Sequence, residues 1–132
     1  MRRSFLFMLM LCAIILSSGL LIASGKAPAS KTKSGTVVFY QPVKLLNVVL
    51  QKGEYLIVHD DAAMARGEAC TSVYRVKESG PALVASFHCT PVPRDAVKNF
   101  TVRMAVPTPG AMEEVREFQF AGSTESHLVP VK

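Results

Sequence analysis

Short apolar runs alternate with turn residues along most of the chain. Beyond Gly35 these runs are rich in β-branched and aromatic side chains, and Gly, Pro or Asp separates them. No stretch keeps a period of 3.6 residues, so the pattern favours strands over helices. We expect strands at 36–40, 45–50, 54–59, 71–76, 82–89, 100–106 and 115–120, with an edge strand at 127–131. Seven or eight short strands predict an all-β fold, a small antiparallel β-sandwich.

Three segments qualify this reading. Residues 61–69 are small and polar and predict a loop or a single helical turn. Residues 111–116 contain good helix formers, but the Phe-x-Phe pattern that follows favours a strand or a short turn leading into one. Pro91 and Pro93 are expected to end the strand at 82–89, because proline cannot donate a backbone hydrogen bond.

Alternation within the strands predicts which side chains face the core. Residues two apart along a strand lie on the same face, so the apolar member of each alternating pair should be buried. The predicted core comprises Val37, Phe39, Tyr55, Ile57, Leu83, Phe87, Val102, Met104, Phe118 and Phe120.

The N-terminal segment has the pattern of a signal peptide. Arg2 and Arg3 precede an apolar run at 5–16, and small residues follow up to Gly25. We therefore predict a signal peptide at 1–25, a flexible polar tether at 26–34 and a folded domain at 35–132. An uncleaved anchor is the alternative, because residues 20–22 extend the apolar stretch toward the roughly 20 residues that a bilayer span needs. The expected location is periplasmic or extracellular.

The net charge of +5 does not indicate a nucleic-acid-binding surface. Basic residues outside the tether are scattered and alternate with acidic ones, which is typical of a mixed solvated surface. The expected partner is therefore a protein or a small molecule of unknown identity, not a nucleic acid. Contact with a membrane is expected only through the N-terminal segment, if it is not cleaved.

Two cysteines, Cys70 and Cys89, remain once Cys12 is removed with the signal segment. An even number of cysteines in an exported domain predicts a disulfide. The two lie at the open ends of the hairpin expected from 71–76 and 82–89, which makes the bridge plausible. The chain-entropy model gives such a bridge about 3 kcal/mol of stabilisation.

The segment VVFYQPVKLLNVVLQKGEYLIVHDD, residues 37–61, resembles a group of small exported bacterial β-sandwich proteins. The pattern consists of an opening strand and then Leu50, Gly53 and Tyr55 in a turn that enters the next strand. The later FHCTP and EFQFAG segments are similar to the same group. The resemblance implies a β-sandwich and an exported location, and it implies no activity.

No catalytic residues are predicted, because the chain has no nucleophile motif, EF-hand spacing or glycine-rich phosphate loop. The main interpretation is an exported, non-catalytic binding or structural module that needs no cofactor. The alternative is a zinc- or copper-binding protein that uses His59, His88 and His127, which all lie at the ends of expected strands. A blue-copper site is not expected, because Cys89 is assigned to a disulfide and the next histidine comes 38 residues later.

Overall fold

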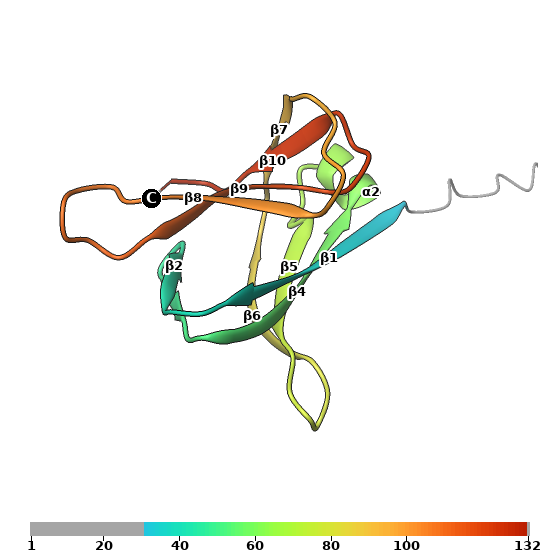
Figure 1. Cartoon of the computed structure of the whole chain (residues 1–132). Coiled ribbons are helices and arrows are strands. Elements are labelled where there is room, and N and C mark those ends of the chain that lie inside the picture. Colours follow the sequence, from blue (N-terminus) through green and yellow to red (C-terminus); the bar gives the residue numbers. More distant parts are fainter. Residues whose placement is uncertain (1–30, 132) are drawn as a thin grey trace, which may run out of the picture.

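The structure is a computed structural model that describes residues 31–131. It has two β-sheets, mostly antiparallel, and one short helix in this range (Figure 1), which confirms the all-β prediction. The predicted signal peptide and most of the predicted tether lie outside the described residues.

The first sheet has four antiparallel strands in the order β1-β4-β5-β6. They are β1 (Thr32–Phe39), β4 (Gly53–Asp60), β5 (Thr71–Arg75) and β6 (Ala82–Phe87). The β5–β6 hairpin forms where the sequence predicts it, with Thr71 opposite Phe87 at its open end.

The second sheet has the order β3-β2-β9-β10-β7, and a sixth strand, β8, pairs with β9. The strands are β2 (Val43–Leu45), β3 (Val48–Leu50), β7 (Thr90–Pro93), β8 (Thr101–Ala105), β9 (Glu114–Gln119) and β10 (Glu125–Leu128). One bridge, between β2 and β9, is parallel.

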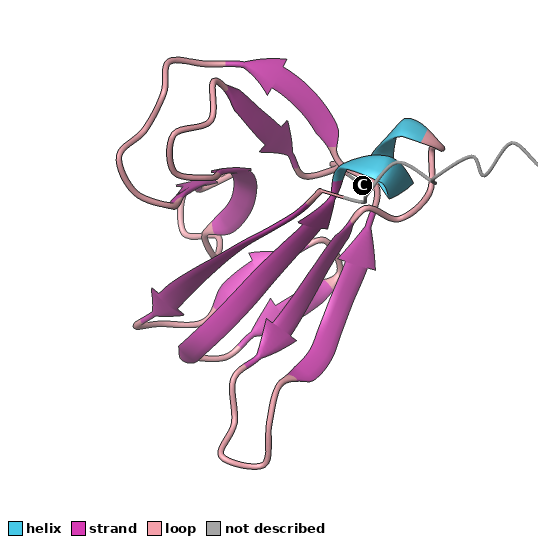
Figure 2. Ribbon diagram, turned by 90° about the vertical axis from the view of Figure 1, so that its right-hand side faces the viewer, coloured by secondary structure: helices cyan, strands magenta, loops and turns pink. Residues whose placement is uncertain are grey.

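The short helix α2 (Asp61–Ala65) lies at one end of the four-stranded sheet (Figure 2). Asp60 caps its N-terminus: the side-chain oxygen accepts hydrogen bonds from the backbone N–H groups of Ala62 at 2.9 Å and Ala63 at 3.2 Å. An aspartate at the N-cap satisfies donors that the first helical turn leaves unpaired. Of the two alternatives predicted for residues 61–69, a loop or a single helical turn, the structure has the helical turn at Asp61–Ala65.

The core lies between the two sheets. Phe87 from the first sheet meets Phe118 from the second edge-on, with ring centroids 6.4 Å apart. Six predicted core residues are buried, namely Phe39, Tyr55, Ile57, Phe87, Phe118 and Phe120. Val37 and Val102 are partly buried and pack against this core.

Two core predictions are wrong. Leu83 is 59% exposed and Met104 is 40% exposed. The β5–β6 register shifts between Val73 and Tyr74, and the β8–β9 register shifts beside Met104. In β6 the extra residue is Val84, which reverses the face of Leu83 beyond it, and simple alternation does not anticipate this. In the β8–β9 pair the extra residue lies in β9, so the register does not account for the exposure of Met104.

Three strand predictions also need correction. The strand expected at a sheet edge at 127–131 corresponds to β10 (Glu125–Leu128), which is not at an edge because it pairs with β9 and with β7. The expected strand at 45–50 is divided into β2 and β3 by a turn at Leu46, whose φ is 53°. Pro91 and Pro93 do not end the sheet structure; they lie within β7, the edge strand that pairs with β10. Proline is tolerated at a sheet edge, where one side of the strand needs no hydrogen bonds.

Candidate metal centre

His59 lies near the end of β4 and points into the core. Tyr55, Ile57 and His59 alternate with less buried residues along this strand, so the histidine occupies the third inward-facing position. Its side chain has no exposed surface and packs beside Phe118 and Phe120. The strand's alternation therefore places an imidazole at a site that would normally hold an apolar side chain.

His127 reaches the same place from the second sheet. It lies in β10, is completely buried, and stacks on Phe118 with centroids 5.2 Å apart and an interplanar angle of 19°. Its ring centroid is 4.1 Å from that of His59. The two sheets thus bring two of the three predicted histidine ligands into direct contact.

Cys89 completes the cluster. It lies between β6 and β7 with no exposed surface, and its Sγ is 3.5 Å from His127 Nδ1. One ligand atom from each of His59, Cys89 and His127 lies within 4.8 Å of the other two. We name these three residues the His-Cys-His cluster. Two imidazoles and a thiolate are a ligand set that suits zinc or copper.

The imidazole nitrogens of the cluster are poorly satisfied. Among residues 31–131, His59 Nδ1, His59 Nε2 and His127 Nε2 are buried without a hydrogen-bond partner. Asp61 Oδ1 lies 3.1 Å from His59 Nδ1, but the two groups are not aligned for a hydrogen bond. A buried polar atom without a hydrogen-bond partner destabilises the folded state, so such atoms are rare in native proteins. A bound metal would satisfy one nitrogen of each ring.

Both histidine rings are neutral at pH 7, because their pKa values are lowered. Burial lowers the pKa of His59 below its ordinary value, and burial followed by the proximity of His59 lowers the pKa of His127 to about 4. A neutral imidazole is the form that binds a metal. At pH 7 neither ring needs to lose a proton before it can act as a ligand.

The thiol of Cys89 behaves differently. Burial, followed by its hydrogen bond with Cys70, raises the pKa of Cys89 to about 12. Without a metal this sulfur is therefore a thiol at neutral pH. A metal binds thiolate, so binding at this site would release the Cys89 proton.

A second sulfur approaches the cluster from α2. Met64 is partly buried, and its Sδ lies 3.9 Å from Cys89 Sγ. The helix therefore places a thioether next to the thiol. A thioether is a soft ligand that favours copper.

Cys70, just before β5, lies on another side of Cys89. The two Sγ atoms are 3.0 Å apart, and the backbone N–H of Cys89 is 3.3 Å from Cys70 Sγ. The hairpin therefore brings the cysteines together, as the sequence predicts. A disulfide has a bond of about 2.05 Å, and in this structure both cysteines are free.

His88, the third predicted ligand, is placed away from the cluster. It is exposed, and its Nδ1 lies 2.8 Å from the carbonyl oxygen of Glu68. Successive residues of an extended chain point to opposite sides, so His88 faces outward while Phe87 and Cys89 face inward. The same alternation predicts that Cys89 faces inward, but it does not predict that Cys89 lies beside the histidines.

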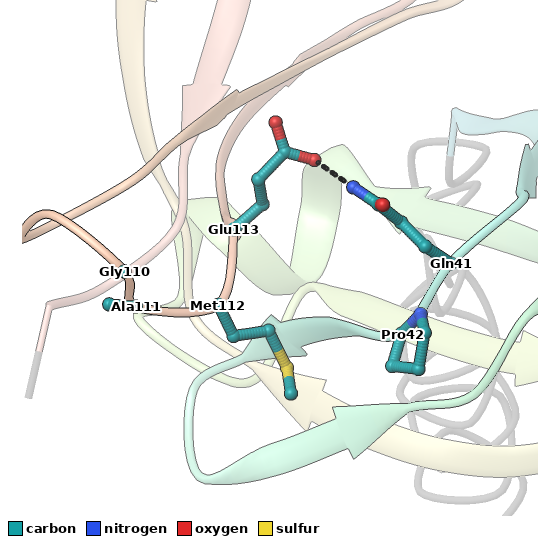
Figure 3. Close-up of a pocket in the computed structure, with 6 residues that line it drawn as sticks. All are labelled: Gln41, Pro42, Gly110, Ala111, Met112 and Glu113. Carbon is teal, nitrogen blue, oxygen red and sulfur yellow. Dashed lines mark hydrogen bonds between the residues drawn. The ribbon is translucent and has the colours of Figure 1, made fainter.

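Two other polar features lie away from the His-Cys-His cluster. Gln41 and Glu113 face each other across a surface pocket near Met112 and are joined by a hydrogen bond of 3.0 Å (Figure 3). Glu117 is buried between Arg94 and Arg103, which both donate to it at 3.0 Å. The Gln41–Glu113 pair lines an open surface hollow, and the charge of Glu117 is compensated by the two arginines. Neither feature has the unsatisfied buried ligand atoms that the His-Cys-His cluster has.

The described part of the chain holds no helix with the length and apolarity that a bilayer crossing requires. Comparison with protein-family models, curated proteins and solved structures finds no match to this chain.

Proposed function

We propose that this chain is an exported, non-catalytic β-sandwich protein that binds a transition metal through His59, Cys89 and His127. The observation that carries the proposal is the convergence of three completely buried ligand atoms within 4.8 Å. Export is supported by the signal-peptide pattern of residues 1–25. A β-sandwich is supported by the two sheets that share one core.

Burial of the whole cluster supports binding over catalysis. Catalytic zinc sites keep one coordination position open to water or substrate. Here all three ligand side chains have no exposed surface, so a fourth ligand would come from the protein. Such a site suits metal storage, transfer or electron transfer.

The neighbouring sulfurs distinguish two metals. Met64 as the additional ligand gives two imidazoles, a thiolate and a thioether, a set that favours copper. Cys70 as the additional ligand would instead give the Cys₂His₂ set of structural zinc sites. We favour copper, because Met64 and Cys89 together supply a thioether and a thiolate, the soft ligands that copper prefers. Copper also binds nitrogen and sulfur sites more tightly than zinc in general.

The test is competitive titration of the reduced protein with Cu(I), without oxygen, against a chelator of known affinity. We expect one tightly bound ion per chain and a loss of at least about 100-fold in affinity for Cys89→Ser. His88→Ala is the matched control, since it removes a histidine next in sequence that faces outward. Wild-type affinity in Cys89→Ser, or an equal loss in His88→Ala, would show that the cluster is not the binding site.

Met64→Leu separates the two metals, because it removes the thioether and keeps a similar volume. We expect it to weaken Cu(I) binding and leave Zn²⁺ binding unchanged. A variant that loses zinc and copper equally would mean that Met64 acts through packing and not as a ligand.

A further inference from the structure

Cys89 Sγ has two neighbours that compete for it. On one side lies the His127 nitrogen at 3.5 Å, and on the other lies the Cys70 sulfur at 3.0 Å. A thiolate can bind a metal, whereas a sulfur in a disulfide carries no charge and is a poor ligand. The same atom therefore cannot serve both neighbours at once.

We propose that Cys70 is a redox switch for the metal site: formation of a Cys70–Cys89 disulfide expels the metal, and its reduction restores the site. This inference rests on the proposed function. Cys89 would be a metal ligand in the reduced protein and a disulfide partner in the oxidised protein.

The geometry requires little movement. The sulfurs need to approach by about 1 Å to reach the bonding distance of about 2.05 Å. Their strands are already paired, with Thr71 opposite Phe87, and the Cys70 N–H donates to the Phe87 carbonyl at 3.1 Å. The backbone at the end of the hairpin is thus held in place in advance.

The oxidant is a small disulfide of the glutathione class. Cys70, which keeps a little exposed surface while Cys89 has none, attacks it first. One S–S bond of glutathione disulfide breaks, a Cys70–glutathione disulfide forms, and the first glutathione leaves with the Cys70 proton. The Cys89 thiolate then attacks the Cys70 sulfur, the second glutathione leaves as thiolate, and the metal ion is released. Two electrons pass from the cysteines to glutathione.

Cobalt(II) is the probe for the test, because it replaces zinc or copper at such sites without oxidising thiols, and its bond to thiolate gives a charge-transfer absorption. The reduced full chain is titrated with Co²⁺, and the titration is repeated after equilibration with glutathione disulfide. Mass spectrometry after alkylation reports whether the intramolecular disulfide has formed. We expect oxidation to remove the charge-transfer band and weaken Co²⁺ binding at least about 100-fold. Reduction should restore both.

Cys70→Ser is the decisive variant, because it keeps Cys89 and cannot form the intramolecular bridge. It should bind Co²⁺ like the reduced wild type, and glutathione disulfide should leave that binding unchanged. Loss of Co²⁺ binding in reduced Cys70→Ser would make Cys70 a ligand and overturn the switch.

The remaining outcomes separate the two proposals. If the reduced wild type binds no Co²⁺ with a thiolate band, the proposed metal site itself fails. If the reduced protein binds Co²⁺ but excess glutathione disulfide forms no bridge, only the switch fails. The same holds if the bridged protein still binds Co²⁺ with the affinity of the reduced protein.

Discussion

His59 and His127 come from different sheets, and their rings lie 4.1 Å apart with no exposed surface on either. Two buried imidazoles in contact are unfavourable unless something satisfies their nitrogens, because a buried polar atom loses its hydrogen bonds to water and must find a replacement. Their shared neighbours are the aromatic rings of Phe118 and Phe120 and the sulfur of Cys89. The contact between two buried histidines distinguishes this point of the core from ordinary apolar packing.

The metal-free protein should lose stability as the pH falls from about 6.5 toward 4. The unfolded state takes up protons on its histidines near pH 6.5, whereas in the folded state burial holds the pKa of His127 at about 4. The unfolded state therefore binds more protons in this window, and stability rises with pH across it. The expected loss is about 2–3 kcal/mol, measured by urea unfolding at a series of pH values.

A variant identifies the source of that pH dependence. His127→Gln should flatten the profile between pH 4 and 6.5, while the surface variant His88→Ala should keep the wild-type slope. An unchanged slope in His127→Gln would assign the pH dependence to other groups.

Phe118→Ala should destabilise the protein by about 3–5 kcal/mol, because it removes the ring on which both His127 and Phe87 pack and leaves a cavity. Leu83→Ala is the matched control: it also removes a large apolar side chain, but from a residue that is 59% exposed. Denaturant unfolding should show a change of no more than about 0.5 kcal/mol for Leu83→Ala. Equal losses in the two variants would contradict the assignment of faces in β6.

The structure shows why Leu83 could not be assigned to a face from its sequence alone. The strand's side chains alternate as expected at Phe87, but the register shift opposite Val73 and Tyr74 turns Leu83 outward. Local pattern thus predicts the fold class, the β5–β6 hairpin and most of the core, while bulges depend on cross-strand pairing that the pattern does not encode.

The sequence predicts only part of the candidate site, because the site also depends on contacts between distant strands. His59 and His127 were proposed as ligands, but their convergence depends on how the two sheets stack, which sequence spacing does not fix. An even number of cysteines predicts a disulfide between Cys89 and Cys70, so the pattern does not predict the contact of Cys89 with His127. The proximity of the two cysteines was predicted correctly, and their bonding remains a proposal.

Glu117→Gln should cost about 1–3 kcal/mol, because it weakens charge-assisted hydrogen bonds to Arg94 and Arg103 at a buried position. The Arg94 hydrogen bond lowers the pKa of Glu117, so its stabilising effect is present above about pH 4.3 and is lost as the pH falls further. Glu68→Gln, at an exposed ion pair with Arg66, is the control and should leave the unfolding midpoint unchanged. A midpoint for Glu117→Gln equal to that of the wild type would contradict a structural role for the hydrogen bonds of Glu117 with Arg94 and Arg103.

Export should leave a mature chain that begins near Lys26, after the small residues Ala23-Ser24-Gly25. N-terminal sequencing of protein recovered from the export compartment measures this directly. Retention of Met1 in the exported protein would instead support the uncleaved anchor.

X-ray absorption of the zinc-loaded, reduced protein tests the central claim most directly, because it counts the ligand atoms around the ion. The account predicts nitrogen neighbours at about 2.0–2.1 Å and a sulfur neighbour at about 2.3 Å, with the sulfur shell lost in Cys89→Ser. A shell of nitrogen and oxygen alone in the wild-type protein, or a sulfur shell that persists in Cys89→Ser, would contradict a metal centre built on His59, Cys89 and His127.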